Sequence, residues 1–112
     1  MDLEQADLYV DVCFLTNEEG GRKNMPPIKD ADYTYRPTLF LNNDYTIAYS
    51  CGMAIEKTRE EIKPHVIMES VPVFLLKPDD VLPKLKIGDG IGFSEGLQVV
   101  AKGIITGINP KQ

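Results

Sequence analysis

Few residues in this sequence have the types and spacing that catalysis needs. His65 is the only histidine, and no cysteine or aspartate pair lies near it at metal-ligand spacing. Adjacent carboxylates occur at 18–19 and 79–80, but neighbouring side chains of a strand point to opposite faces and cannot share acid–base work. The stretch GDGIGF matches neither a phosphate-binding loop nor a dinucleotide fingerprint. We therefore expect no enzymatic activity, no cofactor, no metal and no small-molecule substrate, and we interpret His65 as a solvated or structural residue.

The remaining candidate chemistry is the binding of an anionic or acidic partner by basic side chains. Residues 18–37 read EEGGRKNMPPIKDADYTYRP, a long loop between two apolar runs. Its adjacent glycines permit positive φ angles, and Arg22 and Lys23 follow them directly. Arg36 adds a third cation just before the next apolar run, and long loops of this kind are usually functional. The alternative is that the two arginines only form local ion pairs with acidic residues of the same loop, which are Glu18, Glu19, Asp30 and Asp32.

The elements that must position this loop are predicted to be short strands. In residues 8–15 the apolar residues alternate, which places Val10, Val12 and Phe14 on one face. Nine glycines and eight prolines spread along the chain argue against long helices. Further strands are expected at 38–41, 45–49, 66–68, 71–77 and 97–108, with turns at 42–44, 78–80, 88–90 and 94–96.

These segments predict an all-β fold, a single antiparallel β-barrel of six to seven strands with a Greek-key-like order. Gly103 and Gly107 lie in the last predicted strand, as expected where a strand bends tightly around a barrel corner. Pro72 should confine its segment to an edge or a bulge. Residues 51–64 are the least regular, and we favour an exposed hairpin excursion there.

Length and composition indicate one domain, residues 1–112, with 1–7 expected to be a frayed end. The net charge of −5 argues against a general nucleic-acid binder, because such proteins neutralise phosphates with Lys and Arg. Cys13 and Cys51 are too few for a disulfide framework, so reduced, buried thiols are expected. No apolar run approaches the ~18 residues of a membrane span, and the acidic N-terminus does not resemble a signal peptide. We expect a cytoplasmic protein without membrane contact.

Several motifs resemble the third domain of the translation elongation factor Tu family, a small β-barrel. EEGGR, followed in the same loop by YRP and then by the apolar run TLFL, is similar to the start of that domain. Near the other end, LLKPDD and IGFSEGLQVVAKGIITGI are similar to its last two strands. The resemblance covers roughly residues 8–108. It fails in the middle, where KPHVIMES replaces the family's Pro-Gly-Asp turn.

In that family the third domain contacts the T-stem of aminoacyl-tRNA and also packs against partner proteins. The resemblance implies that the corresponding positions of this chain bind RNA or a partner, and they are Gly21, Arg22, Lys23, Arg36, Thr38, Glu95 and Gly96. Two positions depart from the family pattern. Lys23 replaces a common histidine and keeps a donor for phosphate without a stacking ring, and Thr38 replaces a glutamine of longer reach.

Two functions are therefore expected from the sequence. One is a non-catalytic module that binds tRNA-like RNA or a translation-related protein. The other is a protein-interaction module, such as an immunity or regulatory protein that mimics the elongation factor barrel. The acidic charge and the small size favour the second function.

Overall fold

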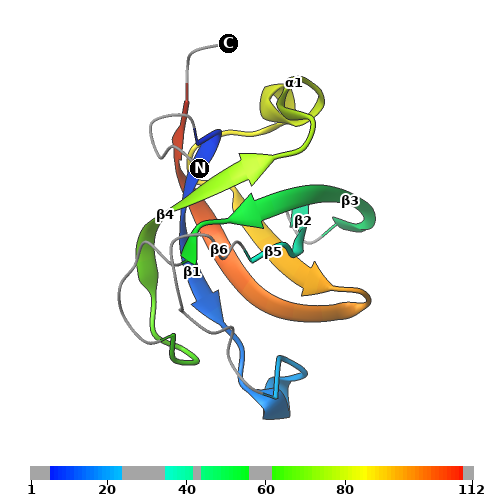
Figure 1. Ribbon diagram of the computed structural model, residues 1–112, viewed down its shortest axis with the longest axis vertical. Coiled ribbons are helices and arrows are strands. Elements are labelled where there is room, and N and C mark those ends of the chain that lie inside the picture. Colours follow the sequence, from blue (N-terminus) through cyan, green and yellow to red (C-terminus); the bar gives the residue numbers. More distant parts are fainter. Residues whose placement is uncertain (1–5, 24–34, 42–43, 56–61, 110–112) are drawn as a thin grey trace.

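The computed structural model describes residues 6–23, 35–41, 44–55 and 62–109, which form a closed barrel of six antiparallel strands (Figure 1). The strands are β1 (Leu8–Phe14), β2 (Thr38–Leu41), β3 (Asp44–Met53), β4 (Met68–Leu75), β5 (Gly90–Glu95) and β6 (Gln98–Ile108). The order around the barrel is β1-β4-β3-β2-β5-β6, and β6 pairs with β1 to close it.

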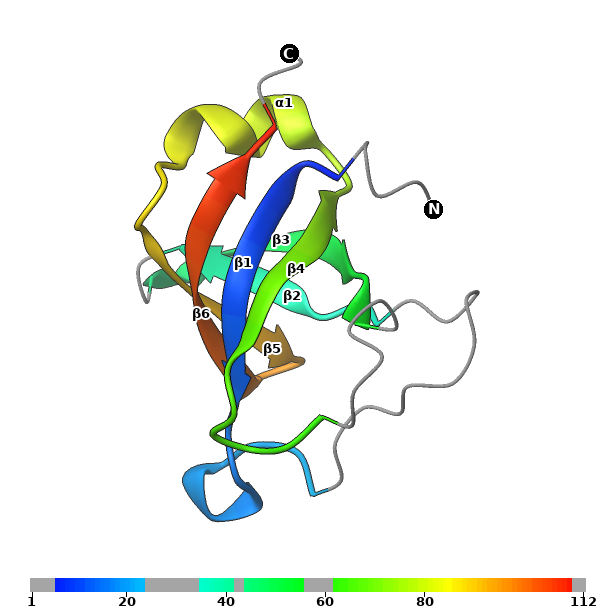
Figure 2. The same cartoon turned by 90° about the vertical axis from the view of Figure 1, so that its left-hand side faces the viewer.

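The connections of this barrel make a Greek key. Strands β2, β3 and β4 are neighbours in sequence and in space, and β5 returns to lie beside β2. Figure 2 shows β6, β1 and β4 side by side, with β2 and β5 crossing behind them. The expected all-β, antiparallel, Greek-key barrel is confirmed.

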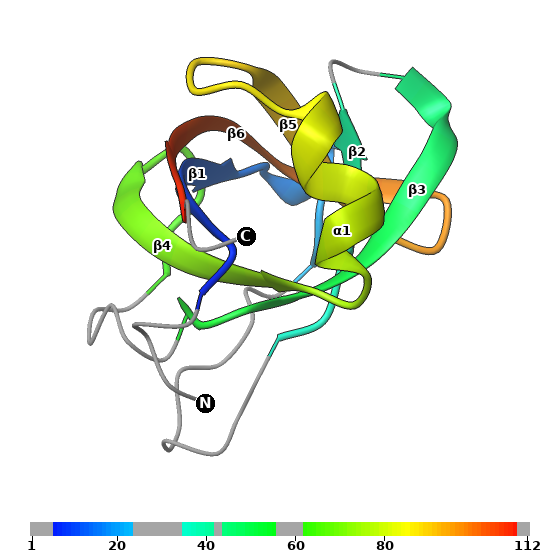
Figure 3. The ribbon, with the colours of Figure 1, turned by 90° about the horizontal axis from the view of Figure 1, so that it is seen from above.

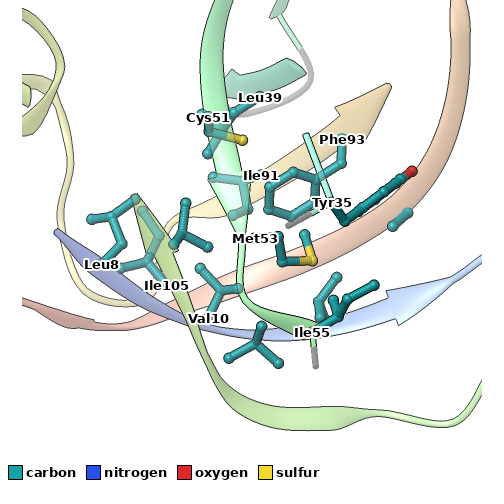
Figure 4. Packing of buried hydrophobic residues seen from close by; sticks show 14 of the residues in the cluster. Leu8, Val10, Tyr35, Leu39, Cys51, Met53, Ile55, Ile91, Phe93 and Ile105 are labelled. Atoms are coloured by element: carbon teal, nitrogen blue, oxygen red, sulfur yellow. The ribbon is translucent and has the colours of Figure 1, made fainter. Parts of the chain in front are cut away.

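The core follows from the alternation in the sequence. The side chains of Leu8, Val10, Val12 and Phe14 in β1 are almost fully buried, while those between them are partly exposed. Residues of the other strands meet them in one hydrophobic cluster, which includes Leu39, Met53, Ile91, Phe93 and Ile105 (Figure 4). The thiols of Cys13 and Cys51 are both free, but only Cys51 is buried as expected; Cys13 lies on the partly exposed face of β1. Burial raises the pKa of Cys51 to about 12.

A short helical segment covers one end of the barrel. Where the sequence predicts a turn at 78–80, the chain forms α1 (Pro78–Val81), and a 3₁₀ helix (Leu82–Lys84) follows it. Pro78 suits the first helical position because its missing N–H would have no partner there. Val81, Leu82 and Leu85 are buried, so the segment closes the barrel end across which Figure 3 shows it lying.

Three expectations about individual segments are corrected. Cys51–Met53 continue β3 and residues 51–55 are all buried, so the first part of 51–64 is not an exposed excursion; residues 56–61 lie outside the described ones. Val66 and Ile67 precede β4 and are more than half exposed, so they belong to no central strand. Asp7 is buried and its carboxylate accepts the N–H of Leu75 at 2.8 Å, so the N-terminal end is ordered from Ala6.

Pro72 occupies a position inside β4 that the sequence assigns to an edge or a bulge. It lies opposite Tyr9 in the β1–β4 ladder, and its carbonyl accepts the N–H of Ala54 at 3.0 Å. The register of this ladder shifts between Val10 and Val12, so the proline lies next to an irregularity, as expected for a residue that cannot donate. No helix among the described residues is long and apolar enough to cross a membrane.

The closure of the barrel depends on a close approach between β6 and β1 at Gly103. A Cβ atom at this position would lie 2.5 Å from the carbonyl oxygen of Asp11, which is backbone and cannot swing aside. Gly90 lies at the start of β5, and a Cβ there would meet nothing within 4 Å. The two glycines therefore form a matched pair for testing the closure.

We predict that Gly103→Ala lowers the free energy of unfolding by about 2–3 kcal/mol, because β6 must move away from β1 to admit the methyl group. Gly90→Ala should change it by less than about 0.5 kcal/mol. Urea unfolding monitored by circular dichroism measures both values. Equal effects of the two substitutions would contradict the close β1–β6 approach.

Candidate binding surface

We call the loop at residues 18–37, which carries Arg22, Lys23 and Arg36, the basic loop. It begins with a tightly fixed turn. Thr16 caps the 3₁₀ helix Asn17–Glu19, and the Thr16 and Glu19 side chains each bond the other's backbone N–H in a capping box. Gly20 ends this helix with φ +94°, a left-handed conformation that glycine adopts without strain. Gly21 is needed for another reason, since a Cβ there would lie 2.6 Å from the carbonyl oxygen of Leu15.

The turn is also held to neighbouring strands. The side-chain amide of Gln98 in β6 donates to the carbonyl oxygens of Gly20 and Gly21, at 2.7 and 2.5 Å. Glu19 pairs with His65, so the lone histidine has a structural partner. The backbone N–H of Thr16, followed by the His65 ring, lowers the pKa of Glu19 to about 2.

Arg22 leaves this turn and forms an ion pair with Glu95 at the end of β5. The hydroxyl of Tyr35 donates to the same carboxylate oxygen, and the guanidinium lies over the Tyr35 ring, 5.7 Å from its centroid. Figure 4 shows the Tyr35 ring at the edge of the core with its hydroxyl pointing away from the cluster. Arg22 is thus paired with Glu95, a residue of β5 that lies outside its own loop.

Burial and the charge of Glu95 together shift the pKa values of Arg22 and Tyr35. Burial works to lower the pKa of Arg22, but the hydrogen bond and charge of Glu95 outweigh it, so the pKa lies above its ordinary value. Burial and the adjacent Glu95 carboxylate raise the pKa of the Tyr35 hydroxyl well above its usual range. The hydroxyl therefore stays protonated and continues to donate to Glu95 across the physiological pH range.

The two other described cations of the loop, Lys23 and Arg36, are placed differently. Lys23 and Arg36 are exposed, and no described carboxylate forms an ion pair with either of them. Asp30 and Asp32 lie outside the described residues, so the expected pairing with them is not described. Arg36 borders a hollow on the outer face of the barrel, which gives it a position beside a surface that could receive a partner.

The described residues line three hollows on this outer face. The first has a volume of about 460 Å³ and is lined by Arg36, Ser50, Phe74 and Leu76, among others. The second, of about 470 Å³, lies toward the β5–β6 turn, where Phe40, Leu97 and Val99 line it. The third, of about 350 Å³, lies between β3 and α1, with Tyr49, Leu76 and Val81 in its wall.

The three hollows are neighbours, because each pair of them shares lining residues. Thr38 lines the first and second, Ala48 the second and third, and Ser50 and Leu76 the first and third. We call this surface the outer groove. Its floor is low because the outward residues of β3, Ala48, Ser50 and Gly52, are small, whereas Leu76 and Leu97 on its walls are 72% and 105% exposed.

Most residues that the resemblance implies gather around the β2–β5 pair. The Thr38 hydroxyl lies 2.5 Å from that of Ser94, the neighbour of Glu95, and Gly96 lines the second hollow beside Thr38. Gly21 and Arg22 are brought to the same side by the ion pair with Glu95. Lys23 is exposed on the loop but lines none of the three hollows.

Sequence reasoning missed the apolar walls of the outer groove. The strand expected at 71–77 carries no assignment of faces, whereas in the structure Val71, Val73 and Leu75 point inward and Phe74 and Leu76 outward. The period-two rule that was applied to β1 would have found Phe74 and Leu76. Gln98, which bonds two carbonyls of the basic loop, gave no signal in the sequence.

This arrangement is suited to binding. Among the described residues, no group of three or more His, Cys, Asp or Glu side chains could hold a metal ion. The outer groove combines apolar walls with a cation at one end, which are the properties of a protein-contact surface. The sequence matches no protein-family model, and a search of curated proteins found no similar one.

We predict that Arg22 and Glu95 are energetically coupled. In a double-mutant cycle with Arg22→Gln and Glu95→Gln, the coupling energy should be about 0.5–1 kcal/mol, a modest value because the two side chains are 27% and 34% exposed. Lys77→Gln, beside α1, combined with Glu95→Gln is the control and should be additive. Unfolding free energies of all variants measure this, and additivity of the Arg22 cycle would contradict the pairing.

Proposed function

We propose that this chain is a non-catalytic protein-interaction module that binds a partner protein through its outer groove. The observation that carries this proposal is a set of adjacent hollows, with Phe74 and Leu76 in the wall of the first and Leu97 in the wall of the second, and with the exposed Arg36 bordering the first. Covering a side chain such as Leu76 would contribute about 1–2 kcal/mol to association. Arg36 would direct binding towards a partner that presents a carboxylate next to apolar side chains.

The charge distribution supports a protein rather than a nucleic acid as the partner. The chain carries a net charge of −5, and the cation at the centre of the expected phosphate site, Arg22, is already neutralised by Glu95. Binding to a phosphate backbone gains affinity from several unpaired cations at once. The two exposed cations that the structure describes in this loop, Lys23 and Arg36, would supply little of this term.

The resemblance to the third domain of elongation factor Tu bears on what kind of partner this is. A small six-stranded Greek-key barrel is the architecture that the resemblance implies, and in that family the domain packs against other proteins. A translation-related protein, or a protein that recognises such a barrel and is masked by it as in an immunity system, fits this inference. Fold likeness by itself does not fix the function.

Binding of tRNA-like RNA is a second candidate, and the exposure of Lys23 and Arg36 on one loop favours it. The two candidates differ in their response to salt and to nuclease. RNA binding should weaken steeply as salt rises, whereas binding by an apolar groove should change little.

We predict that affinity capture from a nuclease-treated extract of the source cells recovers a protein with the wild-type chain as bait. Arg36→Glu and Leu76→Asp should lose this protein, because they reverse the charge and break the apolar wall of the groove. Lys102→Glu changes the net charge as Arg36→Glu does, but Lys102 lines none of the hollows, so it should retain the partner.

Loss of the partner from the Lys102 variant as well would show a general charge effect and contradict the groove. Binding of aminoacyl-tRNA at low salt, abolished by Arg22→Ala with Arg36→Ala, would favour the RNA candidate. A capture that disappears on nuclease treatment would do the same.

A further inference from the structure

Strand β3 is longer than its pairing with β4. It has ten residues, but it pairs with β4 only where Cys51–Met53 lie opposite Val73–Leu75. One further contact follows, in which the N–H of Leu76 donates to the carbonyl of Ser50 at 3.2 Å. The chain then leaves towards α1, and in Figure 1 β3 extends beyond the arrowhead of β4.

The backbone N–H and C=O groups of successive β3 residues point alternately to the two sides of the strand. This alternation shows which of them have no described neighbouring strand at the edge. Ser50 and Ala54 use their backbone groups on the β4 side, with Leu76 and Pro72, whereas the N–H of Met53 donates to Tyr35 on the β2 side. Even-numbered residues of β3 therefore direct their N–H and C=O groups towards β4. At Ala48 and Thr46 no strand among the described residues lies on that side to receive them.

This open edge adjoins the third hollow of the outer groove. Ala48, Tyr49 and Ser50 from the edge line the hollow together with Leu76 and Val81. A strand laid along the edge would place alternate side chains over the hollow, since strand side chains alternate with a period of two. An apolar side chain could then be covered by Leu76 and Val81.

We propose that the open edge of β3 accepts an extended segment of a partner protein as an additional strand, with one apolar side chain of that segment in the third hollow. This inference rests on the proposed protein-binding function and deepens it. The partner segment would form the hydrogen bonds of a β-ladder with β3. The backbone of the segment therefore supplies affinity, and the hollow supplies selectivity.

Two other occupants fit these observations less well. A second copy of the chain would bring together two bodies that each carry a charge of −5, and this repulsion opposes self-pairing. A nucleic acid has no repeating donors and acceptors at the spacing of a strand. The rim residues Lys77 and Asp80 have opposite charges and do not form a field for phosphate.

The test uses the intact chain and peptides selected against it from a displayed random library. Ala48→Pro removes the N–H that faces the open edge and so should break no native hydrogen bond, and proline is tolerated on strand edges. Ala48→Ser keeps the N–H and is the control. Selected peptides should bind the serine variant as they bind wild type, and the proline variant at least tenfold more weakly.

A second readout is independent of how the proline variant folds. Single N-methylation along a selected peptide should weaken binding at least tenfold at every second residue, because alternate amides of an added strand donate to β3. Library selection without any binder, a loss without alternation, or full binding to a folded proline variant would each overturn the inference. A concentration-dependent dimer of the free chain that Ala48→Pro abolishes would assign the edge to a second copy instead.

Failure of this inference can be distinguished from failure of the proposed function. A partner that is captured and lost with Arg36→Glu, but retained with Ala48→Pro, leaves the groove function intact and removes the added strand. A chain that captures no protein at all removes the function itself.

Discussion

After β4 the chain leaves the sheet, and the outer groove and the open edge of β3 both depend on this change of direction. The barrel has an open end, and burial of Val81, Leu82 and Leu85 covers it. Covering it requires the chain to leave the plane of the sheet, and Pro78 begins the helical turn that does so. Because the chain after β4 covers the barrel end, it no longer runs beside β3. This exposes both the β3 edge and the hollow beside Leu76.

The three described cations of the basic loop, Arg22, Lys23 and Arg36, have different roles because only one of them meets a carboxylate in the described structure. Arg22 joins the loop to β5 through Glu95 and to the core through Tyr35, so its charge serves to position the loop. Arg36 follows the same loop but borders the outer groove. A long loop with basic residues can thus look like a phosphate site in sequence although its first arginine forms an ion pair within the fold.

The barrel was readable from the sequence because its strands alternate cleanly and its turns contain glycine. The β1 pattern placed Val10, Val12 and Phe14 on the inner face, and positive φ angles at Gly88 and Gly96 occur within two of the expected turns. The start of β4 differs from the strand expected at 66–68. His65 and Ser70 adopt positive φ angles there, and nothing in a single sequence marks a non-glycine residue for that conformation.

The candidate site was harder to predict than the fold. Sequence reasoning chose the partners of Arg22 from its own loop, whereas the ion pair joins residues 73 positions apart, which only the β2–β5 and β5–β6 pairings bring together. The outer groove depends on small residues of β3 lying between larger ones of β4 and the β5–β6 turn. That juxtaposition follows from the barrel order and is not visible along the chain.

The central claim is that the first half of β3 is bound on one side only. Amide hydrogen exchange of the free chain, followed residue by residue by NMR, tests this most directly. The account predicts slow exchange at Tyr49 and Gly52, whose amides face β2 and β4, and exchange at least tenfold faster at Ala48, whose amide faces the open edge. Equally slow exchange at all three amides would show that the edge is already occupied and would contradict the account.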